Sequence, residues 1–441
     1  MHTDDDGADV GRAALRKASW RILPLIALCY GVSYMDRVNI SFAALQMNRD
    51  LGFTATMYGL GGGLFFLTYA LLEVPSNLLL VRFGARRWIA RILLTWGVLA
   101  TCMMLVRTPM QFYVMRLLVG AAEAGFFPGV VFFLMHWFPA SYRSRVISRF
   151  YVAIPLSAVV MGGLAGSILG LDGRLGLRGW QWLFLIEGLP AVVLSAVVLL
   201  CLPDAPAGAK WLTAPQRDWI VAKLAEDAAA VAREAKIGTL ALLRDPRLLG
   251  FTLAQFCVIA QNYAFNLSAP AILRAQTHLS IANVGYLIAA GGLVGAVSML
   301  VIAWSSDRAQ ERHLHVAIPL LAAAVGAAVI SVGPPPLVVM VAYVVWVAGS
   351  LGTQATLWAI PGSFLQGRAA ALGVAAAGGC SMLGAFIGPW AWGVSVDRTG
   401  GIHLGLLALV ALLVLAAAVF IVQRPTRRLA PAAARAAVSA V

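Results

Sequence analysis

Charged residues are scarce in this sequence: Asp, Glu, Lys and Arg make up 12% of its 441 residues, whereas 61% are hydrophobic. A water-soluble domain of this length needs far more charge on its surface, so the composition excludes one. The alternation of roughly ten residues that marks a membrane β-barrel is missing too, while apolar runs of about 20 residues recur along the whole chain. The sequence therefore predicts an all-α integral membrane protein.

Motifs for metal binding, nucleotide binding and hydrolysis are also missing. The five cysteines lie singly in apolar runs without CxxC or other ligand spacing, and the six histidines form no zinc pattern. Because GxxxxGK[ST], HExxH and GxSxG do not occur, neither an ATP-driven pump nor a membrane-embedded enzyme is indicated. We expect a protein that is not an enzyme and holds no metal and no cofactor.

Twelve membrane-spanning helices are predicted in two bundles of six, over residues 20–202 and 247–422. The spans cover residues 20–46, 54–81, 88–106, 110–137, 146–170, 180–202, 247–273, 281–304, 315–333, 337–360, 368–394 and 402–422. The acidic N-terminus lacks the basic start of a signal peptide, so the first run is expected to remain as a helix.

Three polar segments complete the predicted organisation: a tail over residues 1–19, a linker over 203–246 and a second tail over 423–441. Within the linker, apolar Trp219, Leu224 and Val231 alternate with charged residues. This pattern predicts an amphipathic helix that lies along the membrane surface.

The distribution of Lys and Arg sets the predicted orientation, because these residues are retained on the cytoplasmic side of a membrane. With the N-terminus inside, most of the 33 basic residues fall in inside segments. Only six fall in outside loops: Arg49, Arg107, Arg174, Arg178, Arg274 and Arg398. Both termini are therefore predicted to be cytoplasmic, and the net charge of +14 reflects topology and contact with anionic lipid rather than nucleic acid.

The two bundles carry an internal repeat. Gly59 precedes Arg82 by the same number of residues as Gly285 precedes Arg308, and each pair runs from a glycine-rich span into a basic inner loop. Such parallel six-helix repeats are typical of carriers that rock about a site near the membrane midplane.

Four ionisable residues within predicted spans are candidates for a polar site: Asp36 and Arg37 in the first, Arg116 and Glu123 in the fourth. A charge in hydrocarbon is costly unless it is paired or hydrated, so such residues usually serve function. Neighbouring helical residues point about 100° apart, so Asp36 and Arg37 can reach different partners. Arg116 and Glu123 are seven residues apart, which places them on one helix face about 10 Å from each other.

These four residue types suit the transport of a carboxylate with protons, in one shared cavity. A guanidinium offers a planar fork of donors to a carboxylate and stays charged, whereas Asp36 and Glu123 can take up protons. Substrate capture by an arginine would release a carboxylate for protonation. The alternative is a static network of ion pairs that holds the helices together.

Several motifs resemble those of the anion:cation symporter family within the major facilitator superfamily, which includes hexonate, tartrate and phthalate permeases. They are Tyr34–Asn39, Glu73–Asn77, Arg116 with Glu123–Gly129, Trp137–Pro139 and Gly388–Pro389. The resemblance extends from about Trp20 to Gln423, and Arg178–Phe184 and Ala209–Thr213 are most similar to the tartrate permeases.

This resemblance implies a major facilitator fold and assigns roles to single residues. Arg37 would bind the substrate carboxylate, Asp36 and Glu123 would take protons, and Arg116 would couple to Glu123. The further substrate-binding positions are Tyr34, Tyr69, Gln255 and Trp358.

The resemblance also identifies gating loops, in which arginines and a carboxylate hold one gate state. The gating residues would be Arg82, Arg86, Asp307 and Arg308. In the first copy, Val81 stands at the acidic position, which weakens that latch.

The sequence departs from the family pattern in the eleventh span, where Gly378 and Met382 replace asparagines that precede Gly-Pro. A shorter or more apolar acid is therefore favoured over a polyhydroxylated aldonate. Glu73 and Glu187 lie in predicted spans too, but near span ends, where we expect their carboxylates to reach the interface rather than take part in transport.

We therefore predict a monomeric, proton-coupled secondary transporter in the bacterial inner membrane. It would import a small organic carboxylate, such as a tartrate-like hydroxy acid, an aldonate or an aromatic acid, by alternating access. The alternatives are an exporter or exchanger on the same fold, and a sensor that binds its ligand without moving it.

Overall fold

The computed structural model describes residues 2–232, 244–365 and 367–424, which form helices and connecting turns with no strand among them. The helices of the first half are α1 (His2–Leu51), α2 (Ala55–Phe83), α3 (Ala85–Cys102), α4 (Pro109–Glu123), α5 (Phe126–Met135), α6 (Ala140–Tyr151), α7 (Ala153–Leu169) and α8 (Gly179–Cys201). Those of the second half are α11 (Pro246–Thr277), α12 (Ile281–Ala309), α13 (His313–Ser331), α14 (Pro336–Gly352), α15 (Gln354–Ala359), α16 (Gly367–Thr399) and α17 (His403–Val422). The linker contributes α9 (Ala214–Ala232), and the 3-10 turns are Met103–Leu105, Arg174–Gly176, Pro206–Gly208 and Pro361–Ser363.

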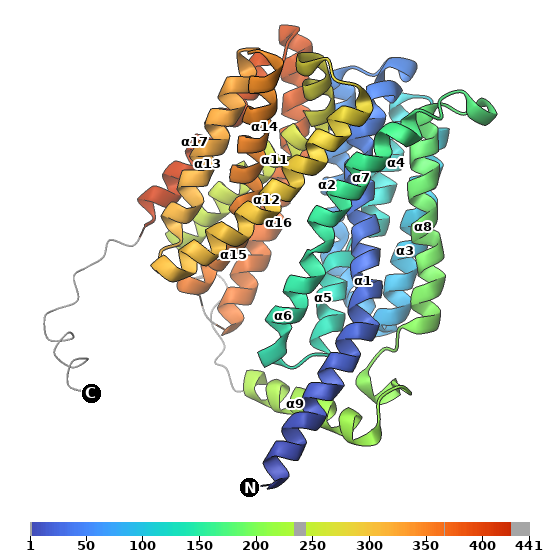
Figure 1. Cartoon of the computed structure of the whole chain (residues 1–441), viewed down its shortest axis with the longest axis vertical. Helices are drawn as coiled ribbons and strands as arrows, with labels where there is room; N and C mark the ends of the chain where they lie inside the picture. Colours follow the sequence, from blue (N-terminus) through green and yellow to red (C-terminus); the bar gives the residue numbers. More distant parts are fainter. Residues whose placement is uncertain (1, 233–243, 366, 425–441) are drawn as a thin grey trace, which may run out of the picture.

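Eleven helical segments among the described residues are long and apolar enough to cross a membrane. The remaining predicted span, 20–46, lies within α1, which is less apolar there because it carries Asp36, Arg37 and Asn39. The predicted all-helical architecture of two six-span halves is thus confirmed. In Figure 1 the halves stand side by side, with α1–α8 on one side and α11–α17 on the other.

Three of the predicted spans are each divided into two helices, and in the fourth the backbone between the two leaves helical angles. The fourth ends as α4 at Glu123, passes through extended Ala124 and left-handed Gly125 (φ 81°), and resumes as α5. A side chain at Gly125 would meet the Ser76 hydroxyl on α2, so this turn requires glycine. The fifth span divides at Val152 into α6 and α7, and the tenth at Thr353 into α14 and α15.

The N-terminal segment and the linker pack against each other. The helix of the first span continues through the predicted tail and begins at His2. Within this extension, Gly11 contacts the Trp219 ring of α9. Ile220 of α9 is fully buried. Apolar side chains of α9 therefore contact protein, and its position along the membrane surface stays a prediction. The side chain of Val231, linker residues 233–243 and tail residues 425–441 lie outside the described part of the chain.

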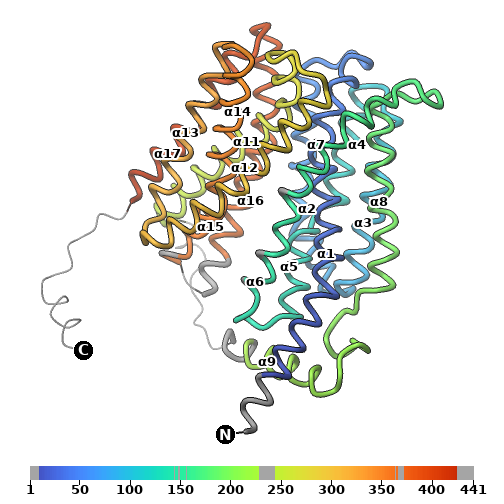
Figure 2. The backbone as a smooth tube through the Cα atoms, in the orientation of Figure 1, coloured from blue at the N-terminus to red at the C-terminus, as the bar shows by residue number. Residues whose placement is uncertain are grey.

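We call the end of the molecule that carries α9 the linker end and the opposite end the distal end. Figures 1 and 2 show that the two halves meet at the distal end and diverge toward the linker end. Glycines make the distal contact close: a Cβ at Gly59 of α2 would collide with the Pro389 carbonyl of α16, and one at Gly162 of α7 with the Gly285 carbonyl of α12. The structure is therefore closed at its distal end.

All three hydrogen bonds that join the halves, among the described residues, lie at this distal end. The Asp397 carboxylate of α16 accepts from the N–H groups of Ala55 and Thr56 at the start of α2. The Tyr58 hydroxyl donates to the Leu267 carbonyl of α11 over 3.0 Å.

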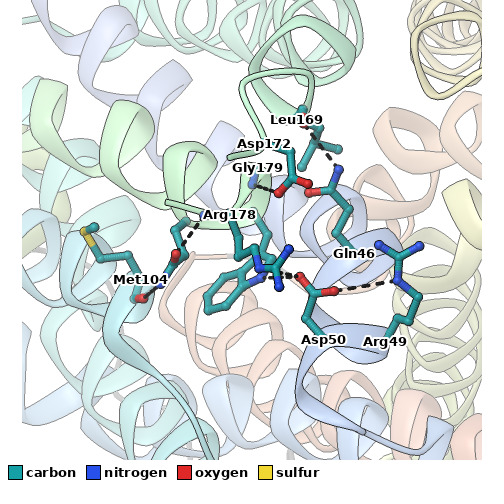
Figure 3. A network of polar contacts seen from close by, with 10 residues as sticks. Gln46, Arg49, Asp50, Met104, Leu169, Asp172, Arg178 and Gly179 are labelled. Atoms are coloured by element: carbon teal, nitrogen blue, oxygen red, sulfur yellow. Dashed lines mark hydrogen bonds and ion pairs between the residues drawn. The ribbon is translucent and has the colours of Figure 1, made fainter. Parts of the chain in front are cut away.

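A polar network at the distal rim belongs to the first half alone (Figure 3). The Asp50 carboxylate at the end of α1 accepts from the Trp180 indole of α8 over 3.2 Å and lies 3.8 Å from Arg178. Gln46 of α1 donates to the Leu169 carbonyl of α7 over 3.3 Å. These contacts hold α1, α7 and α8 together as one unit, which suits a half that moves as a body.

Candidate functional site

A cavity of about 110 Å³, the central cavity, lies between the two halves. Its wall in the first half comes from α1 and α7, and its wall in the second half from α11, α12 and α14. The predicted site residues on this wall are Tyr34 and Arg37, which is the only charged residue among those lining it in the described part of the chain. The central cavity therefore presents one cation to a bound molecule.

Arg37 forms a buried ion pair with Glu123. Its Nη2 and Nε donate to Glu123 Oε1 over 2.7 and 2.9 Å, and the Ser33 hydroxyl donates to the same oxygen over 2.7 Å. Glu123 is fully buried, whereas 15% of the Arg37 side chain remains exposed. The guanidinium thus bridges a buried carboxylate and the cavity, and it lies 4.9 Å from the centre of the Tyr69 ring.

Asp36 lies on a different face of α1 from Arg37. Its two carboxylate oxygens accept from the Trp96 indole of α3 over 3.0 Å and from the Asn39 amide over 3.2 Å, and it is 4% exposed. Asp36 does not line the central cavity. The expectation that all four ionisable groups share one cavity is therefore corrected: the turn between adjacent helical residues sends Asp36 into the first half.

Arg116 is buried without a close ion pair among the described residues. Its Nε donates to the Gly61 carbonyl of α2 over 3.3 Å, and its guanidinium lies 4.7 Å from the centre of the Phe65 ring. Asp36 and Glu123 both act on it electrostatically. The expected coupling of Arg116 to Glu123 is thus not a direct contact, because Arg116 donates to Gly61 and Arg37 is the arginine that pairs with Glu123.

The other predicted substrate-binding residues are placed differently. Gln255 of α11 is fully buried, and neither amide atom has a hydrogen-bond partner within the described residues. Trp358 of α15 is 37% exposed and packs edge-on against Phe251, with ring centres 5.9 Å apart. Tyr69, Gln255 and Trp358 do not line the central cavity in this conformation.

The wall opposite Arg37 carries polar residues that the sequence reasoning missed. Asn262 and Asn266 of α11 line the cavity and are joined by a 2.8 Å hydrogen bond from the Asn266 amide to Asn262 Oδ1. Ser350 of α14 also lines it and accepts from Gln261 over 3.2 Å. The signal was available, since two asparagines four residues apart lie on one face of an apolar span. These amides supply the polarity that the eleventh span lacks at Gly378 and Met382.

The predicted gating residues lie at the linker end. Arg86 pairs with Asp204 at the start of the linker over 3.4 Å, and its N–H donates to the same carboxylate over 3.0 Å. Arg82 and Arg308 lie over the neighbouring rings of Phe83 and Trp304, and Asp307 is exposed with no ion pair in the described ranges. None of these contacts joins the two halves, and the gating role stays a prediction.

Glu187 corrects a further expectation. It is 4% exposed in the middle part of α8, so its carboxylate does not reach an interface as its position near a span end suggested. Its burial depends on how α1, α7 and α8 pack, which a single sequence does not reveal.

Two halves of six spans that meet around a cavity with a buried guanidinium form the architecture of a membrane transporter. The family model described as "Major Facilitator Superfamily" matches residues 26–389. The chain belongs to this superfamily, and the predicted superfamily and fold are confirmed.

Several relatives match over nearly the whole chain. A protein of Agrobacterium vitis named "Putative tartrate transporter" is 42% identical over 93% of this chain and 91% of its own length. A "Quinolone resistance transporter" of Acinetobacter baumannii is 37% identical over 90% and 92%. A Pseudomonas putida protein named "Putative metabolite transport protein NicT" is 37% identical over 94% and 95%.

Solved structures share the fold at low sequence identity. A bacterial homologue of the human lysosomal transporter Spinster, in an inward-facing and occupied conformation, has a TM-score of 0.75, 16% identity, and coverage of 91% of this chain and 96% of its own. The inward-open xylose transporter XylE from E. coli has a TM-score of 0.75, 14% identity and coverage of 93% and 98%.

Proposed function

We propose that this chain is a proton-coupled carrier that imports a small organic carboxylate, with a tartrate-like hydroxy acid as the first candidate. The observation that carries the proposal is the Arg37–Glu123 ion pair at the wall of the central cavity. A guanidinium that already holds a carboxylate, and is partly exposed to a cavity, is suited to exchange that carboxylate for one on a substrate. The names of the Agrobacterium vitis relatives support the same substrate class.

The proposed coupling is a competition for Arg37. A substrate carboxylate that binds the Arg37 fork displaces Glu123, which then lies buried without its counter-charge. An unpaired buried carboxylate is far less stable than the neutral acid, so Glu123 takes up a proton. Substrate binding and proton uptake thereby become one event, and both are released when Arg37 and Glu123 pair again.

The second wall of the cavity supports a hydroxylated substrate. Asn262, Asn266 and Ser350 present amide and hydroxyl groups across from Arg37, so one end of a small acid can bind the cation while its hydroxyls reach the amides. Tyr34, Tyr263 and Trp346 also line the cavity and offer ring surfaces to an aromatic acid, which is the second candidate class.

We place the linker end in the cytoplasm of a bacterial inner membrane, because the basic loops and α9 lie at that end. Both termini are then cytoplasmic, and this conformation, closed distally, is an inward-facing one. A monomer is the proposed working unit of the carrier. Protons supply the driving force, and no cofactor takes part.

The test is uptake by proteoliposomes of purified protein with an imposed proton gradient. Labelled tartrate should accumulate when the outside is acidic, and a proton ionophore should abolish accumulation. Asp36→Asn and Glu123→Gln should lose accumulation, while Glu123→Gln keeps exchange of internal for external substrate. Arg107→Gln, in an exposed distal loop, is the control that should behave as wild type. Normal accumulation in both acid variants would refute proton coupling.

Export is the second candidate, because a relative 37% identical over 90% of the chain is named for drug resistance. The fold does not fix direction, since the gradients decide it. Uptake by inverted vesicles in place of right-side-out vesicles would favour export. Binding without exchange in either preparation would instead favour a sensor.

A further inference from the structure

Glu187 is a buried acid that the proposed transport cycle does not use. About 12 Å along α8 from Gly179, it is 4% exposed, and neither carboxylate oxygen has a hydrogen-bond partner within the described residues. Such a group in an apolar setting calls for a physical explanation, because buried polar atoms are nearly always paired.

The surroundings of Glu187 are apolar. It lies against a recess of about 140 Å³ between α1, α7 and α8, the side recess, whose other lining residues are Val32, Met35, Leu164, Ile168, Ile186 and Pro190. An apolar recess offers water no partners and does not hold it firmly. No arginine, lysine or histidine of the described chain forms an ion pair with Glu187. The carboxylate form would therefore stand without solvation or counter-charge.

Among the described residues, the polar groups that act on Glu187 come from α1 alone, and Asp36 is the only titratable one of them. They are the Asn39 amide and, beyond it, the Asp36 carboxylate. The side chains facing it from α7 are apolar, and α3 contributes the Trp96 indole, which donates to Asp36. Glu187 and Asp36 thus form a neighbouring pair of acids in one polar cluster.

The two acids of this pair have opposite environments. Asp36 accepts hydrogen bonds on both oxygens, from Trp96 and Asn39, and Arg116 attracts it from nearby, so its surroundings suit a negative charge better than those of Glu187 do. Glu187 has no cation beside it, and the Asn39 amide near it donates to Asp36 instead, so its surroundings suit a neutral acid.

We propose that Glu187 and Asp36 together hold one proton, which resides on Glu187 in this conformation, so that Glu187 is a third proton site of the carrier. When the side chains of Asp36 and Asn39 rearrange within the first half, the O–H bond of Glu187 breaks and an O–H bond forms on Asp36. Glu187 then becomes the carboxylate, and the pair keeps a charge of minus one. Because Arg37 follows Asp36 in the chain, this transfer changes the charge beside the substrate cation. The presence of a proton on Glu187 does not depend on the proposed function, whereas the use of this proton in transport does.

Infrared spectroscopy of the full chain in lipid nanodiscs tests the proposal, because a protonated carboxyl has a C=O stretch distinct from that of a carboxylate. At neutral pH the wild type should show this band, and Glu187→Gln should lose it. Glu311→Gln is the control that should keep it, since Glu311 accepts hydrogen bonds from Leu314 and His315 and lies near Arg424 outside the spans. If Glu187→Gln fails to fold, wild-type protein labelled with ¹³C in the glutamate carboxyl should shift the band. A wild type without the band, or a band that survives in folded Glu187→Gln, overturns the assignment.

The shared proton is tested with Asp36→Asn. The Glu187 band disappears when the pH is raised far enough to deprotonate the acid. Without the neighbouring negative charge of Asp36, this loss should occur at a lower pH than in wild type. An unchanged titration overturns the sharing with Asp36. The outcome is separable from that of the proposed function: a band without any proton-driven uptake refutes the transport proposal alone, and proton-driven uptake without a band refutes the Glu187 proposal alone.

Discussion

The Asp397 carboxylate of α16 accepts the N–H of Thr56 over 2.8 Å at the start of α2, and so joins the second half of the molecule to the first. Its other oxygen accepts from Ala55 over 3.0 Å. An anion at a helix N-terminus gains from both the free N–H groups and the helix dipole. Because opening of the distal end must separate α2 from α16, this contact stabilises the closed state alone.

Asp397→Asn should therefore favour distal opening. The amide keeps one acceptor but loses the charge, which removes about 1 kcal/mol, or roughly a fivefold change in the ratio of the two states. The measurement is the modification rate of a cysteine placed near Gly59, which should rise. Asp172→Asn is the matched control, because Asp172 accepts from Gly179 N–H within the first half. Equal rates in the two variants would show that Asp397 does not act as a latch.

Arg37→Lys should weaken substrate binding by about tenfold or more. Lysine keeps the charge but loses the planar fork, of which Nε and Nη2 both donate in this structure. Calorimetric titration with tartrate gives the Kd directly. Arg91→Lys, on the part-buried α3 helix away from the central cavity, should leave the Kd unchanged. A wild-type Kd in Arg37→Lys would mean that the fork does not hold the substrate.

The sequence was sufficient for the architecture and for part of the site, and packing explains the rest. A charged residue in an apolar span is a recognisable functional candidate because burial of a charge in lipid is energetically costly. The sequence alone therefore sufficed to choose Asp36, Arg37, Arg116 and Glu123. Which arginine holds Glu123 depends on how α1 approaches α4, and that information is not local in the chain.

Two other features of the structure that the sequence did not reveal also result from packing. Glu187 lies near a span end by count, but its burial follows from the packing of α1 and α7 around it. The apolar side chains of α9 suit lipid and protein equally, and the helical extension of α1 explains why Trp219 contacts protein. The break at Gly125 had a local signal, a glycine followed by Pro128, which the long apolar run concealed.

Asn262→Ala should reduce affinity for a hydroxy acid while leaving its deoxy analogue unaffected. The loss of one hydrogen bond to a substrate hydroxyl is worth about 1 kcal/mol, or roughly fivefold in Kd. Titration of the variant with tartrate and with succinate compares the two acids at the same charge. Equal losses for both acids would contradict a hydroxyl contact and point to a general disturbance of the cavity wall.

Gly125→Ala should destabilise the protein and disturb the end of α4 where Glu123 sits. A left-handed backbone at a residue with a Cβ costs about 1–2 kcal/mol, and the new methyl group would also press on the Ser76 side chain. The midpoint of thermal unfolding in detergent should therefore fall. Gly163→Ala is the matched control, since Gly163 lies within α7 with no atom near its Cβ position, and helix propensity favours alanine there. Because Glu123 is the last residue of α4, proton-driven accumulation should fall further in Gly125→Ala than the loss of folded protein explains. A midpoint equal to that of wild type would show that the chain can pass this turn without glycine.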